Sequence, residues 1–295
     1  MKRSLLSALS LFSFPEIIRI ISTHLSNKYH FISFQKSAHL FSEYLLFVDL
    51  IDKHIKFRNY SSGLIQANIL INKRPYKIIL RKNTSDIKVF QMVLVDEEYK
   101  LSKDHLLKKS KKAPVIIDAG SNIGLTSIYY FAFMPDAKII SIEPNLSNFA
   151  IQEINIKING LKNTVLLNKA LWFREENLFI SKKFRDNQHW SSQVMSSEHM
   201  DSFRSESVTT ITLNDIAEQF RLTHIDLLKM DIEGSEKYLY EDQKFVELIN
   251  SHVSAVVIEI HDEYKIRHHI DSVMNKFGFI SSSSNDLTFY QRTPS

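Results

Sequence analysis

The residues best suited to chemistry begin with a short segment that combines an acid with glycines. Asp118 is followed by Gly120, Ser121, Asn122 and Gly124, directly after an apolar run. Glycine allows a tight turn and a close approach of backbone to a ligand, so we predict that these five residues bind a cofactor. Their Gly-x-x-x-Gly spacing differs from the Gly-x-Gly-x-x-Gly loop that holds a diphosphate, and a carboxylate would repel phosphate. The segment favours a ligand with amino or hydroxyl groups.

A second acid, Glu143, ends the next apolar run, 19 residues beyond Gly124. An acid at an offset of roughly 20 residues binds ribose hydroxyls in dinucleotide-binding sheets. Together with Asp118, it describes a site for a nucleoside without phosphates, such as S-adenosyl-L-methionine. Asn168 and Ala170 follow the third apolar run, where an adenine edge is expected. They complete the predicted cofactor site.

Four later side chains are candidates for catalysis. Asp231 and Glu233 follow the fourth apolar run, and Glu259 and His261 end the fifth, each pair on one side of an extended segment. The set describes a proton-relay site or a weak divalent-metal site, and the sequence favours the version without a tightly bound metal. Among the four, His261 is the base best matched to neutral pH. Glu236 is expected instead to stabilise the N-terminus of the next helix.

A parallel sheet would bring all these positions to one edge. The short apolar runs that predict buried strands lie at 115–117, 138–142, 165–167, 225–230 and 254–260. Helical periodicity follows several of them, and two more strands, at 279–280 and 287–290, flank a polar turn at 281–286. We therefore predict an α/β, doubly wound, mostly parallel seven-stranded sheet with an antiparallel edge strand.

The residues before this sheet divide into two parts. Helical spacing predicts an N-terminal helical arm over 1–60, and alternation around the turn at 72–75 predicts a β-hairpin within a segment and linker over 61–112. The methyl-donor-binding domain is expected at 113–295. The first apolar run stops at Pro15, short of the roughly 20 residues of a membrane span. The basic stretch 103–112 is expected to be a solvated loop.

Composition narrows the function classes. The chain has 295 residues and no cysteine, which excludes disulfides, thiol nucleophiles and cysteine-based zinc sites. A net charge of +4 is too small and dispersed for a nucleic-acid footprint, so no nucleic-acid partner is expected. A cytoplasmic location is expected.

A polar insertion after the third apolar run contains Trp172 and the stretch 186–195, with His189 and Trp190. These aromatic and amide side chains could contact the face of a sugar ring or simply pack at the surface. We assign them no catalytic role.

The ordered motifs resemble the FkbM-type S-adenosylmethionine-dependent methyltransferases. The resemblance covers roughly residues 75–262 and rests on Asp-x-Gly-x-Asn-x-Gly from Asp118, Glu-Pro at Glu143, and Asp-x-Glu-Gly-x-Glu from Asp231. It departs from the family at Ser121 and Ser235, where alanine is common, and at Asn214, where aspartate is common. It implies the class I methyltransferase fold and methylation of a hydroxyl on a small-molecule or glycan acceptor. Residues 1–60 lie outside it and are expected to serve acceptor specificity or homodimer formation.

Two other functions stay open at this point. A nicotinamide-dependent oxidoreductase would use a similar sheet but requires the Gly-x-Gly-x-x-Gly loop, which the sequence lacks. A non-catalytic binding protein that kept the fold would be expected to have lost acidic positions, whereas Asp118, Glu143, Asp231 and Glu233 are all present. Amino-directed methylation is disfavoured because no Pro-Pro-Tyr sequence follows the fourth strand.

Overall fold

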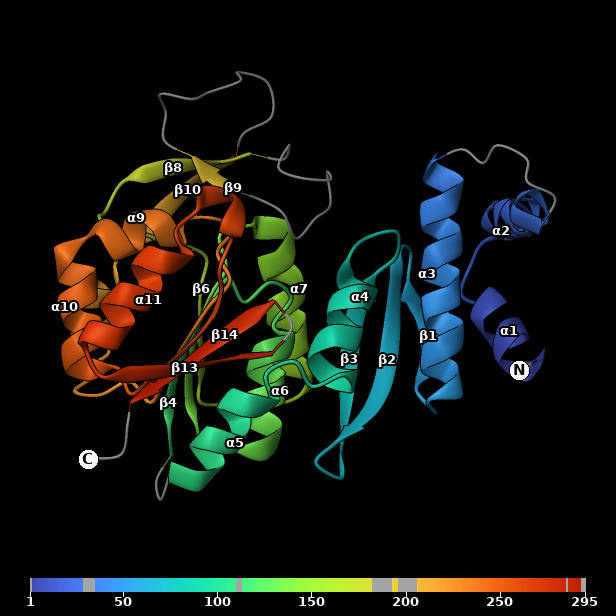
Figure 1. The fold of residues 1–295 in the computed structure, drawn as a ribbon. Coiled ribbons are helices and arrows are strands. Elements are labelled where there is room, and N and C mark those ends of the chain that lie inside the picture. Colours follow the sequence, from blue (N-terminus) through green and yellow to red (C-terminus); the bar gives the residue numbers. More distant parts are fainter. Residues whose placement is uncertain are drawn as a thin grey trace. The chain divides into compact units, whose positions relative to one another are not determined.

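The computed structural model describes residues 2–28, 35–109, 113–181, 193–195, 206–284 and 286–292. The chain divides into two compact units, Met1–Val95 and Asp96–Ser295 (Figure 1). Each unit is described below by itself. Among the described residues, no helix is both long enough and apolar enough to cross a bilayer.

The first unit combines helices with a small antiparallel sheet. Its elements are α1 (Lys2–Leu9), α2 (Phe14–Lys28), α3 (Gln35–Asp52), β1 (Lys56–Ser61), β2 (Leu64–Ile71), β3 (Arg74–Arg81), α4 (Asp86–Phe90) and a π-helical turn, η1 (Gln91–Val95). The strands pair in the order β1-β2-β3. Asn72 and Lys73 join β2 to β3 with positive φ angles of 49° and 62°, the conformation that a two-residue hairpin turn requires. The predicted hairpin is confirmed, and β1 extends it to three strands.

Within this unit, one buried glutamate should make stability depend on pH. Glu43 of α3 is 2% exposed, and its Oε1 accepts a hydrogen bond from the backbone of Asn83 at 3.0 Å. Burial raises the pKa of Glu43 to about 7, and the charges of Glu16, Lys82 and Asp86 act on it more weakly. The folded state therefore holds a proton that the unfolded state releases near pH 4.5.

We expect the stability of the first unit to be highest below pH 4.5 and to fall as the pH rises from 4.5 to 7. By linkage, a rise from 4.5 to about 7 corresponds to a loss of about 3 kcal/mol. Glu43→Gln should remove this part of the pH dependence. Hydrogen exchange of the amides in α3 and β3, compared at pH 5 and pH 8 after correction for intrinsic rates, measures it. Equal pH dependence in both proteins would contradict the assignment.

The second unit is built on a seven-stranded sheet with the order β13-β14-β12-β11-β4-β5-β6. The strands are β4 (Val115–Ala119), β5 (Lys138–Ile142), β6 (Thr164–Leu167), β11 (Leu227–Met230), β12 (Ala255–Glu259), β13 (Phe279–Ser284) and β14 (Leu287–Arg292). Only β14 runs against the others, and it lies one place in from the edge strand β13. The predicted mostly parallel seven-stranded sheet is confirmed, but the antiparallel strand is not the edge strand, because β13 pairs on its outer side. The predicted polar turn at 281–286 is shorter than expected, because β13 continues to Ser284.

Helices cover both faces of this sheet, as Figure 1 shows. On one side lie α6 (Leu125–Phe133) and α7 (Leu146–Ile158), and on the other α9 (Glu236–Glu241), α10 (Gln243–His252) and α11 (Arg267–Lys276). A further helix, α8 (Leu213–Gln219), packs its buried Leu213 and Ile216 into the apolar core that includes β4, β11 and β12. This core holds the strands in register and so positions their ends.

Strand order decides where the site lies. From β4 the chain proceeds outward to β5 and β6, and it then returns to the other side of β4 to form β11 and β12. The order therefore reverses beside β4. In open α/β sheets ligands bind at such a switch, beyond the carboxyl ends of the strands. The ends of β4, β5, β11 and β12 carry the predicted functional residues.

Between β6 and β11 the chain forms a smaller sheet, ordered β7-β10-β8-β9. Its strands are β7 (Ala170–Leu171), β8 (Asn177–Ser181), β9 (Gln193–Met195) and β10 (Glu206–Ile211). Trp172 is 5% exposed, packs among apolar residues of this sheet and donates its indole N–H to Glu176 at 2.6 Å. It therefore has a packing role. His189 and Trp190 lie outside the described residues.

One expectation for the second unit is wrong. The basic stretch that begins at Lys103 is not a solvated loop, because residues 103–109 belong to α5 (Lys100–Lys109). The Lys103 ammonium lies 2.7 Å from Glu97 Oε2 and 4.4 Å from the centre of the Phe133 ring, with the side chain only 7% exposed. The charge of Lys103 is balanced and its side chain is buried, so the run of basic residues did not by itself indicate a solvated loop. Residues 110–112 lie outside the described part.

Candidate active site

The loop between β4 and α6 uses its own amides internally. Four backbone N–H groups of this loop donate within the protein: those of Gly120, Ser121, Asn122 and Gly124. The first two reach the carbonyl oxygen of Ile142 at 2.9 and 3.0 Å, and the fourth reaches that of Ser121 at 2.8 Å. The third donates to Glu143 Oε2 at 2.8 Å. None of these four amides is therefore left to hold a phosphate.

Glu143 anchors this loop to the end of β5. The side chain is 5% exposed, and its Oε1 accepts from the backbone of Asn145 at 2.8 Å and from the side-chain amide of Asn148 at 3.3 Å. Burial raises the pKa of Glu143 to about 7, although these donors and the one from Asn122 act in the opposite direction. Near neutral pH the carboxylate is therefore poised between its two protonation states.

Asp118 lies beneath the loop rather than on its surface. It is 0% exposed, its Oδ2 accepts from the Ser127 hydroxyl at 2.7 Å, and its Oδ1 lies 3.4 Å from the ammonium of Lys229. The ammonium also donates to the carbonyl oxygen of Gly120 at 2.7 Å. The negative charge expected to repel phosphate is thus matched by a buried cation, and Asp118 holds the loop from below. The contacts of the loop amides, not this charge, distinguish the site from a diphosphate cradle.

The two residues predicted to contact adenine have structural partners. Asn168 donates its side-chain amide to the carbonyl oxygens of Glu143 and Pro144, at 2.9 and 3.1 Å, and so fixes the turn after β5. Ala170 is 3% exposed and belongs to β7, where its side chain packs in the small sheet. Asn168 therefore stabilises the turn that follows Glu143, whereas the Ala170 side chain faces the interior.

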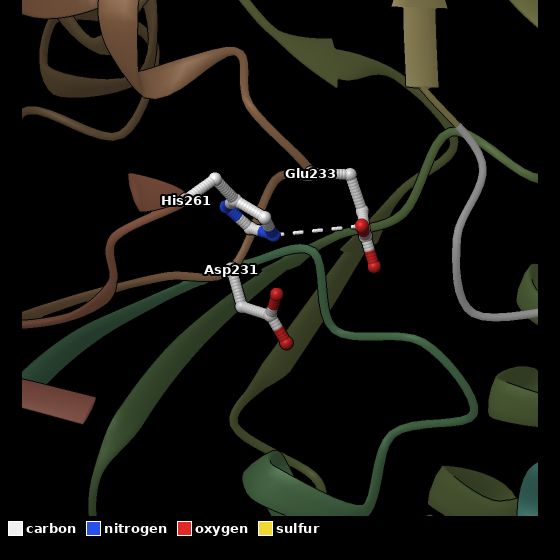
Figure 2. A group of neighbouring side chains, drawn as sticks. All are labelled: Asp231, Glu233 and His261. Atoms are coloured by element: carbon white, nitrogen blue, oxygen red, sulfur yellow. Dashed lines mark ion pairs between the residues drawn. The ribbon is translucent and has the colours of Figure 1, made fainter. Parts of the chain in front are cut away.

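Beyond the loop, the ends of β11 and β12 bring three of the predicted catalytic side chains together. Asp231, Glu233 and His261 each present one donor atom, and these atoms lie within 4.8 Å of one another. Figure 2 shows the imidazole directed at the Glu233 carboxylate, with Asp231 pointing into the same space. Glu259 joins the edge of the group, with Oε1 at 3.9 Å from His261 Nε2. All four residues predicted from the sequence thus lie in one cluster.

A turn, not an extended segment, brings Glu233 into the cluster. Glu233 has a φ angle of 56°, and Gly234 follows with 92°. A Cβ at Gly234 would lie 2.4 Å from the Tyr264 ring, so a side chain there would displace that ring. The two-residue alternation used to pair Asp231 with Glu233 therefore does not hold, and the turn places them together instead.

His261 lies between two carboxylates. Its Nε2 is 3.5 Å from Glu233 Oε2, and its Nδ1 is 3.3 Å from Oε1 of the wholly buried Glu236. Burial of the ring lowers its pKa, but the carboxylates of Glu233, Glu236 and Asp231 outweigh burial and raise the pKa of His261 to about 11. The ring therefore carries its proton at neutral pH, unlike the neutral base expected from an ordinary histidine.

Surrounding acids show the same crowding of negative charge. Burial, assisted by Asp231 and Glu233, raises the pKa of Glu259 to about 8. Glu98 precedes α5, and burial together with Asp231 raises its pKa to about 7. Lys229 is the counter-charge: burial lowers the pKa of its ammonium, but Asp118 and Asp231 outweigh this effect and raise it.

Sequence reasoning missed the roles of Lys229, Glu236 and Glu98. For Lys229 a signal was present, because a single lysine interrupts the apolar strand Leu227–Met230 and a buried lysine requires a partner. Glu236 was assigned to the helix end, where its Oε1 does accept the Ile232 N–H at 3.2 Å, but the same oxygen also faces His261. Glu98 gave no local signal, since it comes from a distant segment.

Comparison with known proteins adds to this geometry. A model of the methyltransferase FkbM domain matches residues 118–281, which contain the glycine loop, Glu143 and the whole cluster at β11 and β12. Methyltransferase sdnD of Sordaria araneosa is 27% identical over 198 residues, which are 56% of this chain and 73% of that protein.

Several methyltransferases are among the similar solved structures. A SAM-dependent methyltransferase from Agrobacterium tumefaciens superposes with a TM-score of 0.45 at 9% identity, over 81% of this chain and 72% of that one. A precorrin-6y C5,15-methyltransferase from Geobacter metallireducens GS-15 gives a TM-score of 0.39 at 13% identity, over 66% and 87% of the two chains.

Proposed function

Because the chain belongs to the FkbM methyltransferase family, we propose that it transfers the methyl group of S-adenosyl-L-methionine to a hydroxyl oxygen of a sugar, glycan or glycosylated natural product. In this reaction the carbon–sulfur bond of the sulfonium breaks as a carbon–oxygen bond forms. The hydroxyl loses its proton, and the products are S-adenosylhomocysteine, a methyl ether and a proton. Holding the acceptor oxygen in line with the methyl group accounts for much of the rate in such a displacement.

The observation that carries the cofactor assignment is the internal use of the loop amides. Four N–H groups of the loop between β4 and α6, the segment that approaches the diphosphate in dinucleotide-binding sheets, already have acceptors in the protein. A nucleoside without phosphates needs no such donors. The same observation disfavours a nicotinamide-dependent oxidoreductase.

We assign the ribose to Glu143. Oε2 of Glu143 accepts one hydrogen bond within the protein, from Asn122, so the ionised carboxylate can also accept one from a ribose hydroxyl, which contributes about 1.5–3 kcal/mol. Glu143 lies at the end of β5 beside the glycine loop, the position at which a ribose is bound in related sheets. Asn168 supports the adjoining turn.

The acceptor hydroxyl is assigned to the space above β11 and β12. Asp231 and Glu259 have side chains 30% and 31% exposed, so both can meet a ligand, whereas Glu233 and His261 are more enclosed, at 17% and 1%. We assign the proton of the hydroxyl to Glu259, at the open edge of the cluster. Asp231, Glu233 and His261 then position the acceptor oxygen.

Calorimetric titration with S-adenosylmethionine tests the cofactor assignment. We expect saturable binding by the wild-type protein and a loss of about tenfold or more in affinity for Glu143→Ala, since a hydrogen bond to a charged group and the anchor of the Asn122 amide are removed. Glu153→Ala, which removes an exposed acid of α7, is the matched control and should bind like wild type. Equal affinities for wild type and Glu143→Ala would remove Glu143 from the site, and binding of a reduced nicotinamide dinucleotide in its place would overturn the proposed function.

The affinity for S-adenosylmethionine should also increase with pH. With a pKa of about 7, Glu143 is mostly protonated at pH 6 and mostly ionised at pH 8, so the dissociation constant should fall about tenfold between them. Glu143→Gln should bind weakly at both pH values and lack this dependence. A pH dependence of the same size in Glu143→Gln would assign it to another group.

The acceptor class is tested by transfer of a radiolabelled methyl group. Incubation with labelled donor and glycan or glycolipid extracts should give label that is stable to base, as expected for an ether. Label that base releases would indicate an ester and would contradict O-methylation of a sugar hydroxyl.

A further inference from the structure

We propose that Asp231, Glu233 and His261 bind a divalent cation of the Mg²⁺ or Mn²⁺ type, which holds the acceptor hydroxyl in place. The inference rests on the proposed methyltransferase function and adds to it a second bound component. Whereas the sequence favoured an active site without a tightly bound metal, the arrangement of side chains around His261 leads to the opposite conclusion.

The donor atoms are close enough for one ion. One atom from each of the three residues lies within 4.8 Å of the others, and Glu233 Oε2 is 3.5 Å from His261 Nε2. Ligands at about 2.1 Å from an octahedral ion are about 3.0 Å apart when adjacent and about 4.2 Å apart when opposite. Small side-chain adjustments therefore complete the set. Two carboxylates and one imidazole leave three positions of an octahedral ion for water or a hydroxyl.

A second, independent observation comes from the imidazole itself. His261 is 2% exposed, and among the described residues neither of its ring nitrogens makes a hydrogen bond of good geometry. A buried polar group without hydrogen bonds is costly. In Figure 2, Nε2 faces the Glu233 carboxylate, and the Asp231 carboxylate lies beside the same space. A cation there would displace the proton of Nε2 and give this nitrogen a ligand bond in place of its 3.5 Å ion pair with Glu233.

The other side of the ring has the support typical of a metal ligand. Metal-binding histidines usually direct their second nitrogen at a carboxylate or carbonyl group, which fixes the ring and the tautomer. His261 Nδ1 lies 3.3 Å from Glu236 Oε1, and Glu236 is wholly buried at the start of α9. Nδ1 therefore faces a fixed carboxylate and Nε2 faces the two ligand carboxylates.

The charges around the cluster also favour a cation. Four carboxylates, from Asp231, Glu233, Glu236 and Glu259, surround one imidazole. The nearby ammonium of Lys229 lies 3.9 Å from Asp231 but is closer to Asp118, at 3.4 Å. Binding of the cation releases the proton of the His261 imidazole to solvent, after which the carboxylates of the cluster have no positive partner within it other than the ion. A divalent ion would restore the balance.

Bound in this way, the cation would act on the acceptor. A hydroxyl oxygen coordinated to a divalent ion loses its proton more readily, and its position relative to the sulfonium methyl is set by the ion. The proton passes to Glu259 or to water as the oxygen takes the methyl group. Carboxylate oxygens suit Mg²⁺ and Mn²⁺, and the imidazole nitrogen favours Mn²⁺ between these two.

Mn²⁺ binding to the purified full-length protein, treated first with a chelator, tests the proposal without requiring the acceptor. Electron paramagnetic resonance of free Mn²⁺ during titration should show one saturable site per chain. Asp231→Asn and Glu233→Gln should each weaken binding about tenfold or more. Glu247→Gln, an exposed acid of α10, is the matched control and should bind Mn²⁺ like wild type.

Titration with S-adenosylmethionine in the absence of metal separates this proposal from the function on which it rests. Mn²⁺ binding lost in the two cluster variants, with the affinity for S-adenosylmethionine changed less than threefold, would support the cation site. Intact S-adenosylmethionine binding with no saturable Mn²⁺ site, or with one that both variants retain, would overturn the cation site alone. Absent S-adenosylmethionine binding would overturn the proposed function.

Two controls accompany these titrations. Circular dichroism establishes that each variant is folded. Glu236→Gln keeps all three ligands and should weaken Mn²⁺ binding less than either ligand variant.

Discussion

Gly120→Ala is expected to lower methyl transfer by about 100-fold or more, because a displacement of the loop by about 1 Å misplaces the bound cofactor. A Cβ at this position would lie 1.8 Å from the carbonyl oxygen of Asp231, far inside contact distance. The φ angle of 73° adds strain for any residue with a side chain. Since Asp231 also belongs to the cluster with Glu233 and His261, a single methyl group would disturb both the loop and that cluster.

Gly160→Ala provides the matched control for this prediction. Gly160 has a similar φ angle of 67°, but a Cβ there would meet nothing within 4 Å. It should therefore share the backbone strain, a cost of about 1 kcal/mol, without the collision. Initial rates with labelled S-adenosylmethionine, together with the thermal midpoints of both variants, make the comparison. If Gly120→Ala were as active as Gly160→Ala, the close approach of the loop to Asp231 after β11 would not be needed for methyl transfer.

Lys229→Met is expected to destabilise the protein by about 3–5 kcal/mol, the usual consequence of removing one partner of a buried ion pair. The substitution would leave Asp118 buried without its counter-charge and would remove the donor that holds the Gly120 carbonyl oxygen at 2.7 Å. Methionine has a similar volume, so the strand itself should still pack. Chemical denaturation monitored by circular dichroism measures the loss, and cofactor affinity should fall with it.

A second substitution tests the cause of this instability. Asp118→Asn combined with Lys229→Met removes both charges, so the double variant should regain at least about half of the lost stability. Lys244→Met, in an exposed position on α10, should cost less than about 0.5 kcal/mol. A Lys229→Met protein as stable as Lys244→Met, or a double variant less stable than both single variants, would show that the pair does not hold the loop.

The cluster at the ends of β11 and β12 shows how much of the site could be predicted. Asp231, Glu233, Glu259 and His261 were all identified as ends of apolar runs, and parallel strands do bring such ends to one edge of a sheet. The protonation of His261 could not be predicted in this way. It depends on Glu236, whose carboxylate reaches the ring only after a turn at Glu233 and Gly234.

By itself, the sequence determined the strands of the main sheet, their order along the chain and the polar residues that stand at their ends. These depend on hydrophobic runs and glycines, which are local properties that the chain carries wherever it folds. It also carried the motifs of the FkbM methyltransferase family, from Asp118 to Glu236.

Only the tertiary structure decided which charges meet. Strand β11 lies between β4 and β12, so Lys229 reaches Asp118, which is 111 positions earlier in the chain, and the acids after β11 meet His261. The same packing turns the loop amides towards Ile142 and Glu143 and away from any phosphate. Coulomb interactions and hydrogen bonds act over a few ångströms of space regardless of separation along the chain, and for that reason they had to be found in the folded molecule.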